Sequence, residues 1–224
     1  MLEILASVII LSILMAVLMP TVQTGLKRGR EAGCASNLRT IGSYFGLYAA
    51  DHQGNVLPYV NSANHLWPDI IVWNYISPTA STTQGDYKPF FCPSLETRGY
   101  TYESRSPLNY RTTYAINHSV MSSEDIATNK IVRFDKPSRT GVIWDAATWP
   151  GAKPLMAVAA GQEYHITAGD PNCSVGWLHG RSEEYPNRRG LANVLFLDGH
   201  VEAQPDPGNG ELLDIGVQWP NLYP

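Results

Sequence analysis

The first 52 residues carry the clearest pattern of apolar and polar positions in the chain. Residues 4–23 contain no charged side chain, and Glu3 is the only charge before Lys27. The apolar side chains go all the way round a helix built on this stretch, so we expect that helix to be buried on every side, in lipid or among copies of itself. As a helix, residues 4–22 would measure about 28 Å, close to the hydrocarbon thickness of a bilayer.

The pattern changes after a cationic cluster formed by Lys27, Arg28 and Arg30. Apolar residues then recur at steps of four, three, four and three, and these are Cys34, Leu38, Ile41, Phe45 and Tyr48. This spacing predicts an amphipathic helix lying on a globular core. The two halves together predict one helix of about 50 residues, in which Pro20 and Gly25 would permit a kink or a melted turn.

The rest of the chain alternates turns with short runs that are typical of strands. The whole chain contains 19 Gly and 16 Pro, and this content predicts a loop-rich domain. Four runs predict strands, namely TTYAIN, KIVRF, TGVIWDA and ANVLFLDGHVEA, and FFCPS predicts a strand end. A short helix is expected over residues 67–75, and the dipeptide Asp198-Gly199 predicts a hairpin with a two-residue type I′ turn.

The predicted fold class is therefore α+β, with a long helix packed on an antiparallel sheet. We divide it into an apolar helix over residues 1–25, its amphipathic continuation over 26–52, and a β-rich head over 53–224. Charged residues make up 16% of the chain and the net charge is −4, so no basic surface indicates nucleic acid. No HExxH, GxSxG, Walker or EF-hand motif occurs. We therefore expect a protein without a catalytic site.

The opening of the chain resembles the type IV pilin and pseudopilin superfamily. The shared features are an apolar start with a lone glutamate, a proline seventeen residues later (Pro20), and an amphipathic continuation. The segments CASNLRTIGSYFGLYAADHQGNVLPY, TTYAIN, KPSRTGVIWDA and ANVLFLDGHVE are similar to one subgroup, the prepilin-type proteins with a processing-associated H-X9-DG domain. The resemblance covers nearly the whole chain.

This resemblance implies a pilin-like subunit that polymerises with copies of itself through its N-terminal helix. A prepilin peptidase and a pilus or secretion machinery would act on it, first in the inner membrane and then at the cell surface or in the periplasm. Glu3 would pair with the terminal amine of a neighbouring subunit, and Lys27, Arg28 and Arg30 would face lipid headgroups or acids of neighbours. Glu3 stands two positions earlier than the family's glutamate, and the family's methylated phenylalanine is absent.

The H-X9-DG signature is present in altered form. Its DG pair corresponds to Asp198 and Gly199, but Arg188 stands beside the place of the histidine. His179, in LHGR, is separated from Asp198 by eighteen residues, as though SEEYPNRR had been inserted.

Three cysteines leave one unpaired if two form a disulfide. In an exported domain we expect Cys34–Cys92, which would join the helix to the head, with three buried free thiols as the alternative. No second Cys or His stands at zinc-ligand spacing near Cys92, which argues against zinc. Calcium is the one cofactor considered, because related pseudopilins bind it through loop oxygens, and its candidate ligands are Asp145, Asp170 and Asp198.

Two alternatives to a pilus subunit stay open. One is a minor pseudopilin of a type II secretion system, which would form a short periplasmic piston. The other is a monomer anchored in the membrane by the same helix, whose head binds or processes a glycan. The positions of four tryptophans test the second alternative, because tryptophans in the core would argue against a sugar-binding platform. These are Trp67, Trp73, Trp144 and Trp149.

Overall fold

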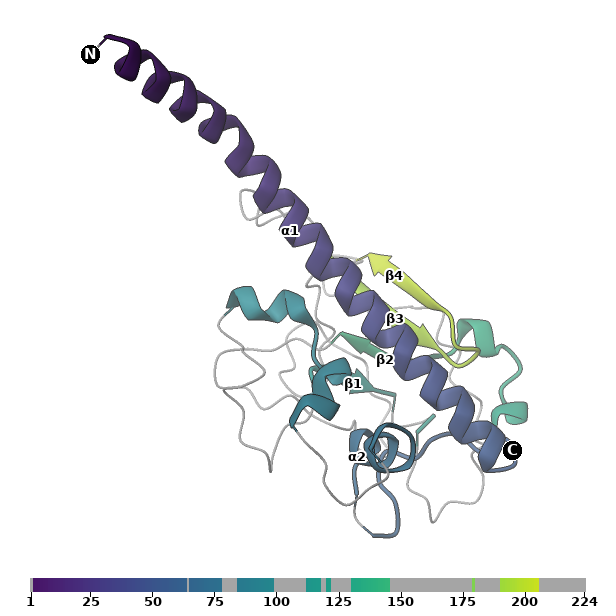
Figure 1. The fold of residues 1–224 in the computed structure, drawn as a ribbon. Coiled ribbons are helices and arrows are strands. Elements are labelled where there is room, and N and C mark those ends of the chain that lie inside the picture. Colours follow the sequence, from purple (N-terminus) through teal and green to yellow (C-terminus); the bar gives the residue numbers. More distant parts are fainter. Residues whose placement is uncertain are drawn as a thin grey trace.

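A computed structural model gives the structure of the 224-residue chain. It describes residues 2–63, 65–77, 84–98, 112–117, 120–121, 130–145, 179 and 190–205. One helix, α1 (Leu2–Asp51), is 50 residues long and organises the molecule. Figure 1 shows its first half extending away from the rest of the chain and its second half lying along a sheet. The single long helix predicted from the sequence is confirmed. It continues through Pro20, so the melted turn does not occur.

The second half of α1 is held by the apolar face that the sequence predicts. Its five apolar positions are all buried in the main core, and Cys34 is the first buried residue along the helix. Gly42 marks the closest approach to the sheet. A Cβ atom there would lie 2.8 Å from Cδ1 of Leu195 and 3.3 Å from the carbonyl oxygen of Gly199. Only glycine therefore permits this packing distance without movement of the neighbours.

The sheet has four strands in the order β1-β2-β3-β4, and every neighbouring pair is antiparallel. The strands are β1 (Tyr114–Ile116), β2 (Gly141–Asp145), β3 (Leu191–Phe196) and β4 (Val201–Pro205). All residues of β2 are buried, whereas the edge strand β4 is largely exposed. The α+β class with an antiparallel sheet is confirmed.

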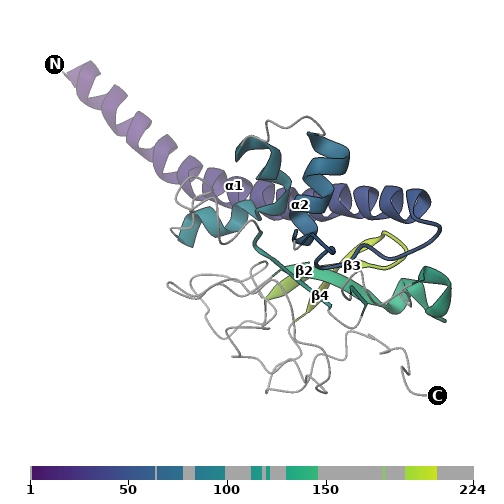
Figure 2. The ribbon, with the colours of Figure 1, turned by 90° about the horizontal axis from the view of Figure 1, so that it is seen from below.

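Short helical turns complete the described core. These are α2 (Trp67–Ile71), the π-helical turn η1 (Val72–Ile76) and the 3₁₀ turns η2 (Gln84–Phe90), η3 (Pro93–Arg98), η5 (Ile131–Arg133) and η6 (Pro137–Arg139). Figure 2 shows α2 on the same side of the sheet as α1. The Trp67 ring lies edge-on to Phe90, with ring centroids 5.3 Å apart. The helix expected over residues 67–75 thus exists, as an α turn followed by a π turn.

Two predicted strands are wrong. KIVRF forms the 3₁₀ turn η5, because the N–H of Phe134 donates to the carbonyl of Ile131. Its first two residues, Lys130 and Ile131, pair with residues 54 and 55 without continuing into a strand. FFCPS is not a strand end. Cys92 lies between η2 and η3, and its N–H donates to the Thr113 hydroxyl at 2.8 Å. Apolar runs of this length satisfy a strand and a buried turn equally well.

The hairpin between β3 and β4 exists, but the predicted turn type is wrong. A type I′ turn needs positive φ at both central residues, and in this hairpin only Gly199 has it, at 90°. The turn is closed one residue earlier, by the N–H of Gly199 donating to the carbonyl of Phe196 at 2.9 Å. Leu197 explains the shift, because it is buried and its N–H donates to Thr140. Asp198 accepts the N–H of His200 and so stabilises the turn.

Candidate functional site

The first half of α1 exposes a continuous apolar surface. Fourteen large apolar side chains are between 54% and 69% exposed, which is unusual for residues outside an interface. They are Ile4, Leu5, Val8, Ile9, Ile10, Leu11, Ile13, Leu14, Met15, Val17, Leu18, Met19, Val22 and Leu26. By length and composition this helix could cross a membrane. Either lipid or protein must cover this surface in the functional state.

The charges predicted to act in assembly lie at the two ends of that surface. Glu3 is exposed in the first turn of α1, and Pro20 is an exposed position within the helix. Arg28 is exposed, whereas Lys27 and Arg30 are partly covered. Glu3 and Lys27 are separated along the helix by about 36 Å, and Arg28 and Arg30 lie further along it, so this cluster cannot neutralise Glu3 of the same subunit. A cation of the cluster can reach Glu3 only from another molecule.

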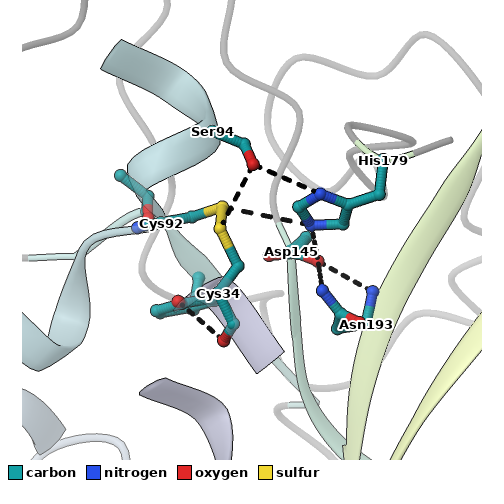
Figure 3. A network of polar contacts seen from close by, with 8 residues as sticks. Cys34, Cys92, Ser94, Asp145, His179 and Asn193 are labelled. Atoms are coloured by element: carbon teal, nitrogen blue, oxygen red, sulfur yellow. Dashed lines mark hydrogen bonds and ion pairs between the residues drawn. A yellow bond between two sulfur atoms is a disulfide. The ribbon is translucent and has the colours of Figure 1, made fainter. Parts of the chain in front are cut away.

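A buried polar network lies where α1 enters the head. We use this name for Cys34, Cys92, Ser94, Asp145, His179 and Asn193, which come from α1, the η2–η3 segment, β2, residue 179 and β3 (Figure 3). A disulfide joins Cys34 to Cys92, the pair favoured by the sequence, with their Cα atoms 4.7 Å apart. Because Cys34 is the first buried residue of α1, the disulfide fixes the helix at its exit from the head.

His179 connects the disulfide to the sheet. Its Nε2 atom lies 2.9 Å from Oδ2 of Asp145 and 4.0 Å from Sγ of Cys92, and its Nδ1 lies 3.4 Å from Oγ of Ser94. The backbone N–H and the side-chain amide of Asn193 also donate to Oδ2 of Asp145, at 2.7 and 3.1 Å. Asp145 and His179 are both buried. The other carboxylate oxygen, Oδ1, is buried without a hydrogen-bond partner among the described residues.

The position of His179 explains how the altered motif is accommodated. His179 and Leu191 exchange both backbone hydrogen bonds, at 3.0 and 2.7 Å, so His179 lies directly opposite the first residue of β3. The inserted letters and Arg188 fall between these residues, outside the described part of the chain. His179 lies at the start of β3, whereas Asp198 and Gly199 lie beyond its end. The motif residues therefore mark the two ends of one strand and do not form a common site.

The network contains the residue types of a serine hydrolase triad, but its histidine is buried. Ser94, His179 and Asp145 follow one another in hydrogen-bonding distance. His179 is 3% exposed, so its imidazole is shielded from solvent, whereas Ser94 is half-buried. Burial, and then the negative charge of Asp145, raise the pKa of the neighbouring Tyr114 well above its usual range. The arrangement can orient groups and bind a cation, and its most evident effect is structural.

The proposed calcium ligands do not converge. Asp145 ends β2 and is buried in the network, whereas Asp198 is exposed in the β3–β4 turn. Leu197, next to Asp198, bonds to Thr140 at the opposite end of β2. One ion cannot reach both carboxylates, so a calcium site that contains the two is wrong. Asp170 and the third cysteine, Cys173, lie outside the described residues.

Sequence reasoning did not find Ser94 or Asn193. Asn193 interrupts the apolar strand LANVLF, and a polar residue at an inward position of a buried strand is the signal that could have found it. Two of the four tryptophans that bear on the glycan alternative lie in the core. Trp67 and Trp144 are buried in the core and Trp73 is partly buried, while Trp149 falls outside the described residues.

Comparisons with protein-family models, with curated proteins and with solved structures found no match to this chain. Among the described residues, the exposed half of α1 and the buried polar network are the features that bear on function.

Proposed function

We propose that this chain is a structural subunit of a type IV pilus-like helical filament and that it polymerises through the first half of α1. The observation that carries the proposal is the continuous apolar surface of that half, which leaves the head as a straight extension of a docked helix. A helix that is apolar on every side needs a surrounding of the same kind. A bundle of identical helices at the centre of a filament supplies it.

Apolar burial alone does not separate a filament from a membrane anchor. Covering the fourteen side chains is worth on the order of 20 kcal/mol relative to water, but lipid covers them as well as protein does. Glu3 distinguishes the filament from the membrane-anchored state. A carboxylate at the apolar edge is costly in lipid, and pairing with the amine of a neighbouring subunit would remove that cost and fix the axial register. This pairing favours assembly over storage in the membrane.

The disulfide supports a firm connection between the filament core and the head. A head that coats a filament would be pulled away from α1 first at the end of the docked segment, where Cys34 is the first buried residue. The disulfide to Cys92 and the bond from the Asn37 amide to the carbonyl of Phe91, at 2.7 Å, both hold the helix there. A covalent bond at this point keeps α1 docked on its own head when the filament is sheared.

The two alternative functions use the same apolar helix and the same head. A minor pseudopilin of a secretion system would assemble through the same helix but remain short and periplasmic. An anchored glycan-binding domain would leave the helix in lipid, and the burial of Trp67 and Trp144 removes two of the aromatic residues that such a platform could use.

The experiment compares two glutamate substitutions in the cells that produce the chain. Glu3→Gln removes the carboxylate at the apolar edge, and Glu202→Gln removes an exposed carboxylate from β4 in the head. We expect sheared fractions to lose the filament only with Glu3→Gln, while membranes keep the folded chain. Normal filaments from Glu3→Gln would refute the pairing, and an absence of filaments from wild-type cells would favour the anchored domain.

A further inference from the structure

The buried polar network brings together four groups that bind transition metals. The sulfur atoms of Cys34 and Cys92, an imidazole nitrogen of His179 and a carboxylate oxygen of Asp145 all lie within 4.8 Å of one another, and all four residues are buried. We propose that, when the disulfide is reduced, these residues form a structural zinc site. The chain would then have two alternative cross-links between α1 and the head, a disulfide and a metal ion. This inference is independent of filament formation.

The spacing of the groups matches a tetrahedral zinc site. Usual zinc bond lengths require about 3.5 Å between a sulfur and a nitrogen ligand and about 3.3 Å between nitrogen and oxygen. The structure has 4.0 Å from Cys92 Sγ to His179 Nε2, and 2.9 Å from that nitrogen to Oδ2 of Asp145, whose other oxygen, Oδ1, is the proposed ligand. These groups need small side-chain shifts to reach zinc distances. The largest change is between the two sulfurs, which must separate to about 3.8 Å by rotation of the reduced side chains.

The unpaired oxygen of Asp145 is independent evidence for a cation. Asp145 Oδ2 accepts hydrogen bonds from His179 and from two groups of Asn193, whereas Oδ1 has no partner among the described residues. A buried carboxylate oxygen without a partner is costly. A metal ion bound at Oδ1 would satisfy it, while Asn193 continued to orient the carboxylate through Oδ2.

The surroundings of His179 match those of a metal-bound histidine. Such a histidine binds through one ring nitrogen and donates a hydrogen bond from the other to an oxygen. His179 directs Nε2 to Cys92 and Asp145 and has Nδ1 within 3.4 Å of Ser94 Oγ. In the disulfide form Nε2 carries the proton shared with Asp145. In the zinc form the proton resides on Nδ1 and is donated to Ser94.

The ligand set selects the metal. Two thiolates and an imidazole favour zinc over calcium or magnesium, which prefer oxygen ligands. Four protein ligands and the burial of all four residues indicate a closed structural site without an open position for substrate. The sequence argument against zinc considered ligands close to Cys92, but His179 is 87 residues away from it.

The conversion balances with a dithiol as reductant. The dithiol transfers two electrons and two protons to the Cys34–Cys92 bond and becomes a disulfide itself. Zinc then binds both sulfurs and releases the two thiol protons. A newly synthesised chain carries thiols before it meets an oxidising compartment, so it can bind zinc without a reduction step.

The test measures metal binding by the full chain in detergent micelles. One sample keeps its disulfide, and the other is reduced with a phosphine under nitrogen, which leaves no thiol reagent to compete for metal. Zinc per chain is measured after passage over a chelating resin, and Co²⁺ replaces zinc for spectroscopy. We expect one zinc per reduced chain and none per oxidised chain, with the thiolate charge-transfer and intense visible bands of tetrahedral cobalt.

Three variants assign the ligands. Cys173→Ser removes the third cysteine and should bind normally, whereas Cys34→Ser with Cys92→Ser should lose the thiolate–cobalt band. His179→Gln should weaken zinc binding at least about tenfold. Near-ultraviolet circular dichroism follows folding, and a reduced chain that unfolds without metal and refolds with zinc would support the site. Reduced wild type that retains no zinc would overturn the proposal, as would unchanged zinc binding in the double cysteine variant or in His179→Gln.

Discussion

Loss of the Cys34–Cys92 disulfide should destabilise the head far more than an ordinary surface change. The perturbation is the double variant Cys34→Ala with Cys92→Ala, with phosphine-reduced wild type as a second form that keeps both sulfur atoms. A chelator in both samples excludes the zinc state proposed above. Cys173→Ala is the control, because it removes a cysteine without touching this bond.

The magnitude follows from the length of chain that the disulfide closes. The two cysteines are 58 residues apart in the sequence. The chain-entropy relation assigns a loop of this size about 14 cal/mol/K, or about 4 kcal/mol at room temperature. Because both sulfurs are buried, the alanine variant loses a smaller packing contribution as well.

Urea unfolding of the full chain in detergent, followed by tryptophan fluorescence, measures the effect. Trp67 and Trp144 are buried in the head and report its unfolding. With a urea slope of about 2 kcal/mol/M, the midpoint should fall by about 2 M in both disulfide-free forms. A shift of less than about 0.5 M in both would refute the reasoning that this bond restricts the unfolded chain.

Two further predictions test the helix and its end. Gly42→Ala should destabilise the head by about 1 to 3 kcal/mol in the same urea assay, because the added methyl group meets Leu195 and a backbone carbonyl. Gly46→Ala, which has open space around it, should not, and equal effects would contradict the close approach. Burial and the hydrogen bond to Asp51 raise the pKa of Tyr75 from 10.0 to about 12. The neutral phenol therefore stabilises the folded state below pH 10, and this contribution disappears as the pH rises through about 12. Tyr75→Phe should flatten the loss of stability over that range, and an unchanged pH profile would show that Tyr75 does not cause it.

The long helix could be predicted because its evidence is local. The uniform apolar run and the spacing from Cys34 to Tyr48 each lie within one segment, and a helix converts such spacing directly into a face. The same holds for β2 and β3, whose apolar runs are bounded by turn residues. The sequence did not determine the turn type at Asp198, because Thr140, which is distant in the sequence, binds the backbone of Leu197.

The buried polar network could be predicted only in part, because its residues come from segments far apart in the chain. Cys34 and Cys92 were paired from compartment and position, but no periodicity brings His179 to either of them. Its place depends on the two backbone hydrogen bonds that His179 exchanges with Leu191. Tertiary contacts of this kind leave no spacing rule in one sequence. Asp145 was named as an oxygen ligand, although its partners are His179 and Asn193.

Electron cryomicroscopy of material sheared from the cell surface tests the central claim most directly. Peptide mass analysis would first establish that the filaments contain this chain. The account predicts a helical core built from the first halves of α1, with Glu3 in contact with a positive group of a neighbouring subunit and the heads outside. Recovery of the chain only as monomers from detergent-extracted membranes would contradict the account.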